Sequence, residues 1–596
     1  MNGFFQNLIS EGKKNEKSFS GFLALLMVFC LAMPRAALSE AESAAPAVHE
    51  FTREEKTMYV FNDSTTIDLP LFFLSDAPDL PYIEITALLN LISQCAAEMG
   101  HPQFLLRCEP DEADEMQVLI SRENGYTAVL DMGRGTLVYK DYDAFVQTSA
   151  QYSLIDIVSF NTEDDTQESI FQRIDQGTFD RYGKELEVDL AAYGINLYYD
   201  HENKAYFVPF KLMFDLLAPA ALSKYTVFYH DGTPFLASRG SFLNGDGTLT
   251  PMGELFENGN QEDRSEALAD YSYRELCLEL DLFYGLKGIH GIQSFDVMFT
   301  NEDFKGQLLS QDALDADTAL ASFIENNLDD LHSDFVRLSP CSDGSVQVTP
   351  GRSYQHMTKI SRYFLEAREQ LLGSDIPFYQ EVGSTAYITF DEFDLDYLDY
   401  YGPLDNAPAN DLVANVIRAH QQIMRADSPV ENVVIDLSCN DGGAVDAATF
   451  LMGWITGDVP ITVQNTMTGA SSTATYRADV DLNHVFDEND TLAGKKVYCL
   501  ISPLSFSCGN LVPLILQEDP RITLIGQTSG GGSCLIKPMA TAYGSMFQIS
   551  SPYRLSLVKN GSLYDVDRGV DPDIQITRIE HFYDREALNA FLAGLY

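Results

Sequence analysis

The sequence predicts an α/β protein whose core is built of βαβ units and is preceded by a helical segment and a β-rich α+β N-terminal domain. Three observations predict this class. From about residue 383 onward, apolar strands alternate with helices, as βαβ crossovers require. Upstream, Leu276, Leu280 and Phe283 recur at helical spacing. Between residues 50 and 235, β-branched and aromatic runs flank glycine turns, which indicates short strands and hairpins.

The N-terminal domain is expected over residues 40–237. The runs 126–130 and 136–139 are β-branched and aromatic, and they flank a Gly-Arg-Gly turn, which predicts a hairpin. A strand–hairpin–strand–helix unit that begins at Ile67 recurs about 121 residues later at Val188. Two copies do not make a solenoid, so the pattern predicts an internal duplication within one accessory domain.

A linker is expected over residues 238–265, because glycine, asparagine and aspartate are concentrated there. The helix that follows is expected to end at Gly285 or Gly288. A second helix is predicted from residue 318 to residue 328, with Asp317 as its N-cap.

The helical segment therefore spans residues 266–337, and the core spans residues 338–596. Near-continuous apolar strands in this core are typical of a buried, largely parallel sheet. Its strands are predicted at 385–390, 433–437, 496–501 and 522–525, and its helices at 411–426, 444–455 and 510–517.

The N-terminus is expected to be a signal peptide over residues 1–39. A basic stretch precedes an apolar run, Gly21 to Met33, which is shorter than the roughly 20 residues of a transmembrane helix. Ala37-Leu38-Ser39 then offers small residues at a signal-peptidase site, so cleavage after Ser39 is predicted. The alternative is an uncleaved anchor, in which case this segment is the chain's contact with a membrane. Either way the protein is expected outside the cytoplasm.

Composition excludes some partners. The 596 residues include 38 Lys and Arg against 88 Asp and Glu, a net charge of 38 − 88 = −50, which argues against a nucleic-acid partner. Of nine cysteines, Cys30 lies in the signal segment, and the remaining eight show no C-x-x-C pair or zinc spacing. Buried free thiols and some disulfides are both compatible with this pattern.

One acidic stretch has a calcium-loop spacing. Asp479, Asp481, Asn483 and Asp490 occupy positions 1, 3, 5 and 12 of an EF-hand loop. His484 stands where that loop needs glycine, so no metal site is predicted, and no cofactor is expected.

Two strand-to-helix turns are candidates for chemistry, because ligand sites in such sheets form at these turns. The first, Asp436 to Gly443, ends in a glycine pair that can expose backbone amides. The alternative is that this segment is only a tight turn between a strand and a helix, with no functional role. The second, Ser502 to Asn510, carries serines at a helix start. Of these, Ser505 is the better capping candidate and Ser507 the better nucleophile.

Together these turns resemble the C-terminal processing, or tail-specific, peptidase family and its tricorn-like branch. The family's D-L-R-x-N-x-G-G loop resembles Asp436–Gly443, where Ser438 replaces the arginine. Its S-x-S-x-S-E segment resembles Ser505–Asn510, and its G-x-x-T-x-G-K-G loop resembles Gly526–Gly532. Its G-[VI]-x-P-D motif matches Gly569–Asp573.

The resemblance implies a crotonase-like peptidase core in which Ser507 is the nucleophile. It also implies that the backbone amides of Cys508 and of Gly442 or Gly443 form the oxyanion hole.

The family's usual catalytic lysine would fall at Gly531, so the resemblance points to the branch that uses an upstream histidine. The segment 328–335 resembles that branch's D-x-H-[ST] motif and places the base at His332. The acid that completes the triad is expected at Asp567, with Asp565 as the neighbouring candidate. An alternative keeps the activity but uses Lys537 as the base.

The predicted function is that of a secreted serine endopeptidase acting on protein or peptide substrates. The alternative is a catalytically degenerate binding or scaffold protein on a peptidase fold, favoured by the missing lysine and arginine. Residues 338–383 are too few for the family's PDZ module, so no tail-recognition function is expected.

Overall fold

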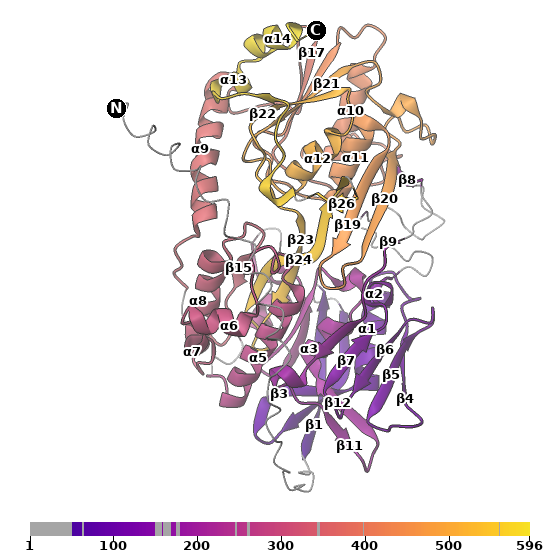
Figure 1. Ribbon diagram of the computed structural model, residues 1–596, viewed down its shortest axis with the longest axis vertical. Coiled ribbons are helices and arrows are strands. Elements are labelled where there is room, and N and C mark those ends of the chain that lie inside the picture. Colours follow the sequence, from indigo (N-terminus) through magenta and orange to yellow (C-terminus); the bar gives the residue numbers. More distant parts are fainter. Residues whose placement is uncertain are drawn as a thin grey trace, which may run out of the picture. The chain divides into compact units, whose positions relative to one another are not determined.

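The computed structural model describes most of the chain from residue 50 onward (Figure 1). The described ranges are 50–61, 65–148, 158, 169–174, 179–244, 247–258, 263–342, 346–396, 398–559, 561–564 and 566–595. The predicted signal peptide, its cleavage site and Asp565 lie outside them. No helix within these ranges is long and apolar enough to cross a membrane.

The first part of the chain builds two sheets. The larger has seven strands in the order β11-β12-β3-β2-β1-β14-β13, and the smaller has five in the order β10-β7-β6-β5-β4. The strands of the two sheets are β1 (Phe51–Phe61), β2 (Thr65–Leu74), β3 (Ala77–Glu84), β4 (Leu106–Pro110), β5 (Gln117–Arg122), β6 (Thr127–Asp131), β7 (Thr136–Tyr139), β10 (Leu186–Asp189), β11 (Tyr198–Asp200), β12 (Ala205–Pro209), β13 (Thr226–His230) and β14 (Thr233–Ala237). The helical elements of this part are α1 (Ile85–Glu98), α2 (Tyr142–Val146), η1 (Ala191–Tyr193), α3 (Phe210–Leu217) and η2 (Ala220–Leu222).

The predicted duplication coincides with two strand–helix units. Strand β3 leads into α1 and β12 leads into α3, and β3 and β12 are antiparallel neighbours in one sheet. The strands that precede the two units lie in different sheets: β2 is in the same sheet as β3, whereas β10 is in the smaller sheet.

Helices dominate the next stretch. The expected linker contains two helical elements, and α4 buries Met252 and Phe256 in a hydrophobic cluster. The second helix differs from its prediction, because α8 begins five residues earlier, at Ala313. The carboxylate of Asp312 caps it, and it continues into a π-helical turn. Asp317 lies inside α8 and is buried. The helical elements are η3 (Arg239–Phe242), α4 (Pro251–Glu257), α5 (Glu266–Phe283), α6 (Phe295–Asn301), α7 (Lys305–Leu308), α8 (Ala313–Phe323) and η4 (Ile324–Leu328).

A mostly parallel six-stranded sheet forms the centre of the core, in the order β16-β17-β18-β21-β22-β27. Alternate residues of β18 face opposite sides: Val433 and Ile435 join the cluster that includes α10, α11 and α12, and Val434 joins the cluster with α9, α13 and α14. Helices therefore cover both faces (Figure 1), and the predicted α/β class with βαβ units is confirmed. The elements are α9 (Arg352–Leu372), β16 (Tyr379–Val382), β17 (Thr385–Thr389), α10 (Leu412–Ile423), β18 (Asn432–Asp436), α11 (Val445–Thr456), β21 (Lys496–Ile501), α12 (Cys508–Leu516), β22 (Ile522–Gly526), η6 (Val566–Arg568), β27 (Ile574–Gln575), α13 (Glu580–Tyr583) and α14 (Arg585–Ala593).

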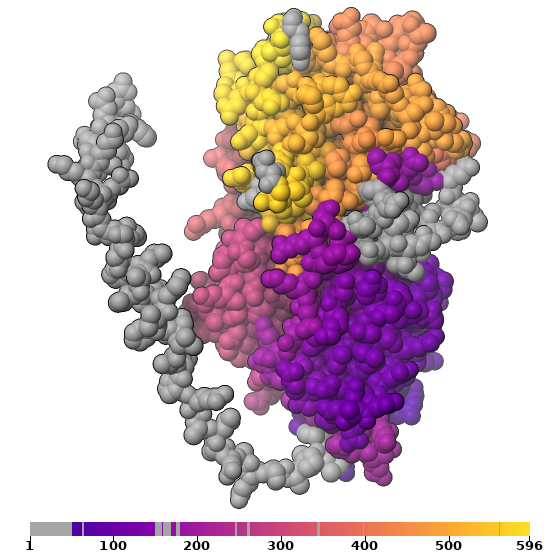
Figure 2. Space-filling view, turned by 45° about the vertical axis from the view of Figure 1, so that its right-hand side comes forward, coloured from indigo at the N-terminus to yellow at the C-terminus, as the bar shows by residue number. Residues whose placement is uncertain are grey.

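A second core sheet joins distant parts of the chain. Its path is β15-β24-β19-β20-β8, with β23 paired to β24 and β9 paired to β20. Strands β8 and β9 come from the region predicted as the N-terminal domain, and a purple patch of that region lies against the orange core in Figure 2. The strands are β8 (Phe171–Arg173), β9 (Phe179–Arg181), β15 (Asp334–Arg337), β19 (Val459–Asn465), β20 (Ser471–Ala478), β23 (Cys534–Ala540) and β24 (Met546–Ser556). The remaining short elements are η5 (Glu488–Asp490), β25 (Val558–Lys559) and β26 (Ser562–Leu563).

Candidate active site

The two strand-to-helix turns singled out in the sequence lie side by side. Strands β18 and β21 are parallel neighbours, with Asp436 opposite Leu500, so both turns leave the same edge of the sheet. The contact is close, since a Cβ placed on Gly442 would lie 2.7 Å from the Cβ of Ser507. Only a residue without a side chain fits at Gly442, whose φ is 117°.

Ser507 has an unusual backbone conformation. Its φ is 54° and its ψ is −119°, in a region that residues with a side chain rarely occupy. Its amide donates to the carbonyl of Gly531 at 2.9 Å, which holds the turn in place. The Ser507 hydroxyl does not cap α12, so a sharp strand-to-helix turn presents it without a structural hydrogen bond in the helix.

The neighbouring serine and cysteine have other roles. The Ser505 hydroxyl is fully buried, donates to the carbonyl of Leu437 at 2.6 Å and accepts from the amide of Ser502. Ser505 therefore braces the two turns and is not the helix cap that the sequence favoured. Burial raises the pKa of the Cys508 thiol to about 12, which keeps it protonated and unreactive at neutral pH.

The backbone amides near Ser507 distinguish between the two glycines. The amide of Gly442 donates to the side chain of Asn440 at 3.1 Å. Among the described residues, the amides of Gly443 and Cys508 have no acceptor. Of the predicted donors, Gly443 and Cys508 are thus the pair free to hold an oxyanion.

His332 reaches this turn from the helical segment. It lies between η4 and β15, where its amide donates to Asp330 and its carbonyl accepts from Gln548. Its ring lies 4.7 Å from the ring of Phe506, centre to centre. The Cε1 atom of His332 would be 3.2 Å from a Cβ on Gly532.

The ring of His332 is buried, with 5% of the residue exposed. Burial lowers the pKa of its imidazole, and the negative charges of Asp330 and Asp567 partly oppose this effect. A general base that acts near pH 7 must have a neutral ring, and the lowered pKa favours this form of His332. No hydrogen bond joins the ring to a described residue, Ser507 included; such bonds are often long in unliganded enzymes.

Two acids act on His332 electrostatically. Asp567 accepts hydrogen bonds from the amide and hydroxyl of Ser533, at 2.9 and 2.7 Å, and forms a salt bridge with Arg554. Asp330, which the family motifs in the sequence do not mark as an acid partner, exerts the larger effect of the two on the pKa of His332. Its sequence signal was its position two residues before the histidine.

The side chain of Lys537, the alternative base, does not point toward Ser507. Its ammonium lies 4.6 Å from the centre of the Phe283 ring, on α5. Burial lowers the pKa of Lys537, while the charges of Asp215 and Glu279 raise it. The adjacent residue, Ile536, lines the cavity at Ser507. Because side chains alternate along a strand, Lys537 faces away from that cavity.

The cavity beside Ser507 has a volume of about 210 Å³ and a mostly aliphatic wall. Its lining residues are Gly443, Val445, Ser507, Cys508, Leu511, Gly532, Ser533, Cys534, Leu535, Ile536, Leu555 and Val566. It can accept an apolar side chain next to the hydroxyl.

The acidic stretch with calcium-loop spacing also comes together. One carboxylate oxygen from each of Asp479, Asp481 and Asp490 lies within 4.8 Å of the others. These carboxylates accept hydrogen bonds from the loop's own amides, including those of Asn483 and His484. They brace the loop, and we assign no ion to it.

The core segment matches a known family. Residues 384–576 match the model of peptidase family S41. A Chlamydia pneumoniae protein is 25% identical over 177 residues, and the chain spans only a quarter of that relative's length. The chain is also similar to a number of solved structures, among them the following three. The photosystem II D1 C-terminal processing protease is 16% identical, with 32% of this chain and 42% of that one covered and a TM-score of 0.24. Mature CPAF complexed with lactacystin is 12% identical, with 55% and 98% covered and a TM-score of 0.37. A putative peptidase from Parabacteroides merdae is 14% identical, with 55% and 96% covered and a TM-score of 0.38.

Proposed function

We propose that this chain, whose residues 384–576 form a peptidase family S41 domain, is a serine endopeptidase that hydrolyses protein or peptide substrates. The observation that carries the proposal is the packing of the buried His332 ring against Phe506, the residue that precedes Ser507 in its strained turn, and beside Gly532.

The chemistry follows from this arrangement. The Ser507 oxygen attacks the carbonyl carbon of the scissile bond while His332 takes the hydroxyl proton. The amides of Gly443 and Cys508 donate to the oxygen that becomes negative. His332 then gives its proton to the leaving amine, and a water molecule, activated by the same ring, releases the acyl group from Ser507.

Asp330 and Asp567 stabilise the imidazolium formed in these steps. Their charges favour the protonated ring, and the contacts of Asp567 with Ser533 and Arg554 hold its carboxylate in place. Since Arg554 neutralises part of the charge of Asp567, we assign the larger electrostatic share to Asp330.

The cavity at Ser507 suggests the residue whose carbonyl is attacked. Its aliphatic wall and volume of about 210 Å³ suit a side chain such as that of valine, leucine or methionine. A charged side chain would lose its hydration there without gaining a partner.

Cleavage of unstructured peptides tests the proposal. The wild-type protein should cut peptides with leucine or valine at the cleaved position, and Ser507→Ala should lower turnover by several orders of magnitude. The exposed Ser374→Ala is the matched control and should keep full activity. A folded wild-type protein that cuts no such peptide would favour the scaffold alternative.

We further propose that the chain is exported, with Glu40 as the mature N-terminus. The support is the apolar run and the Ala37-Leu38-Ser39 site. N-terminal sequencing of the exported protein tests this, and a chain that still begins at Met1 would indicate an anchor.

A further inference from the structure

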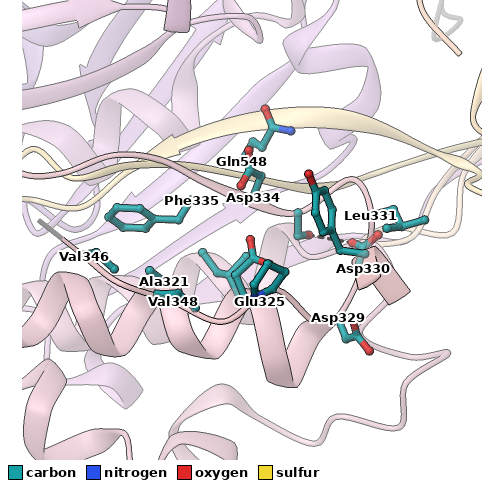
Figure 3. A pocket seen from close by; sticks show the side chains of 14 residues that line it. Ala321, Glu325, Asp329, Asp330, Leu331, Asp334, Phe335, Val346, Val348 and Gln548 are labelled. Carbon is teal, nitrogen blue, oxygen red and sulfur yellow. Dashed lines mark hydrogen bonds between the residues drawn. The ribbon is translucent and has the colours of Figure 1, made fainter. Parts of the chain in front are cut away.

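A cavity of about 480 Å³ lies beside the His332 loop (Figure 3). Leu331 and Ser333, the two neighbours of His332, line it, whereas the His332 ring turns toward Phe506. One wall of the cavity is thus the loop that carries the proposed base. None of the 14 lining residues belongs to the cavity at Ser507.

The lining of this cavity combines carboxylates with apolar side chains. Glu325 of η4 and Asp334 of β15 both line it (Figure 3). Asp329 and Asp330 add two further carboxylates, while none of the described lining residues is a lysine, arginine or histidine. The apolar lining residues are Ala321, Ile324, Leu331, Phe335, Val346, Val348 and Pro350.

The four carboxylates differ in their present partners. Asp329 accepts from the amide of Ser353 at 2.9 Å, and Asp330 accepts from Ser333 and from the amide of His332. Glu325 has one long contact, 3.3 Å, with the amide of Gly351. Asp334 forms no salt bridge with a described residue.

Burial raises the pKa of both Glu325 and Asp334. For Glu325, the amide of Gly351 opposes this effect and nearby carboxylates reinforce it. For Asp334, the charge of Arg239 and the amide of Phe335 oppose it. Two half-buried carboxylates that lack a salt bridge gain most from a cation entering between them.

The strand beside the cavity offers a way for a peptide to enter. Among the strands that the structure describes, β15 pairs with β24 alone and forms the edge of its sheet. Its other edge makes no backbone–backbone hydrogen bond with a described residue. An extended peptide can pair with such an edge and place alternate side chains in adjacent pockets.

We propose that this cavity binds a lysine or arginine side chain of an extended peptide substrate, with Glu325 and Asp334 as its acceptors. The inference rests on the proposed peptidase function and extends it to a second specificity site. A long aliphatic stem would lie along the apolar wall while its charged end meets the carboxylates. Because this cavity and the cavity at Ser507 share no lining residue, the basic residue is not the one whose carbonyl is attacked.

Matched peptides test this. Peptides of one sequence, with leucine at the cleaved position, carry lysine, norleucine or glutamate at single positions two to five residues away on either side. We expect kcat/KM for the lysine peptide to exceed that for the norleucine peptide by about tenfold at one or more positions, as a hydrogen bond to a charged group would give. The glutamate peptide should be the poorest substrate.

Variants assign the preference to the cavity. In Glu325→Gln/Asp334→Asn, the lysine-to-norleucine ratio should fall to about one, while the norleucine peptide is cut as by the wild type. Glu112→Gln removes a charge from an exposed loop and should keep the ratio. A ratio near one in the wild type, or one unchanged in the double variant, overturns the inference alone. Failure to cut every peptide, norleucine included, overturns the proposed function and this inference with it.

Discussion

Replacing Gly532 with alanine should disable the site without unfolding the protein. A Cβ at this position would lie 2.6 Å from the Cζ atom of Phe506 and 3.2 Å from the Cε1 atom of His332. Ordinary contact needs about 3.4 Å or more, so the Phe506 ring must retreat by about 0.8 Å, and the His332 ring packed on it must follow.

The expected loss of activity follows from this displacement of the His332 ring. Displacing a catalytic group by about 1 Å costs on the order of 10²-fold in rate. The φ of +84° adds about 1–2 kcal/mol of backbone strain for a residue with a side chain. We therefore expect kcat/KM to fall about a hundredfold while the melting temperature drops by only about 1–2 °C, because the unfolding entropy of about 2.1 cal/mol/K per residue is large for a chain of this length.

A control at a second glycine separates the effect of backbone strain from the effect of displacing the His332 ring. Gly494 has a φ of +79°, and a Cβ placed on it would have no atom within 4 Å. Gly494→Ala should lose similar stability and keep its activity, as measured with a fluorogenic peptide and by thermal unfolding. Equal kcat/KM for the two alanine variants would refute the role given to the His332 ring.

Four further outcomes are expected. His332→Ala should lose several orders of magnitude in turnover, whereas Lys537→Ala should keep substantial activity in the same assay, because Lys537 faces away from Ser507. Burial lowers the pKa of His332, so the acid limb of the kcat/KM–pH profile should lie below the ordinary histidine value of about 6.5. In Asp330→Asn, which removes a charge that raises this pKa, the limb should move to still lower pH; a move to higher pH would contradict the electrostatic assignment. Val445→Phe, which narrows the cavity, should reduce cleavage after leucine at least tenfold more than cleavage after alanine.

Much of the core could be predicted because its signals are local. A strand that is buried on both faces is apolar at nearly every position, so its sequence predicts it. Strand β21 accordingly spans the predicted residues 496–501. Two sequence features predicted the site: the glycine pair after β18 and the serines in the turn after β21. Glycines leave backbone amides accessible, and a serine at a strand-to-helix turn can expose its hydroxyl. Fixed parallel order then brings the two turns together.

What escaped prediction depends on contacts between distant residues. The predicted N-cap of α8, Asp317, is wrong. Aspartate is a common N-cap residue, but the Asp317 carboxylate is buried and accepts hydrogen bonds from Ser339, Ser342 and Ser545 instead. The insertion of β8 and β9 beside β20 leaves no mark in their own short sequences. The same holds for Arg554, whose pairing with Asp567 only the folded chain creates.

The most direct test of the central claim is to map where a fluorophosphonate probe attaches to the purified protein, because such a probe bonds to a serine activated by a positioned base. Mass spectrometry should find a single adduct on Ser507, formed at least a hundredfold more slowly in His332→Ala. An adduct on Ser505 or Cys508, or no adduct on folded wild-type protein, would contradict the account.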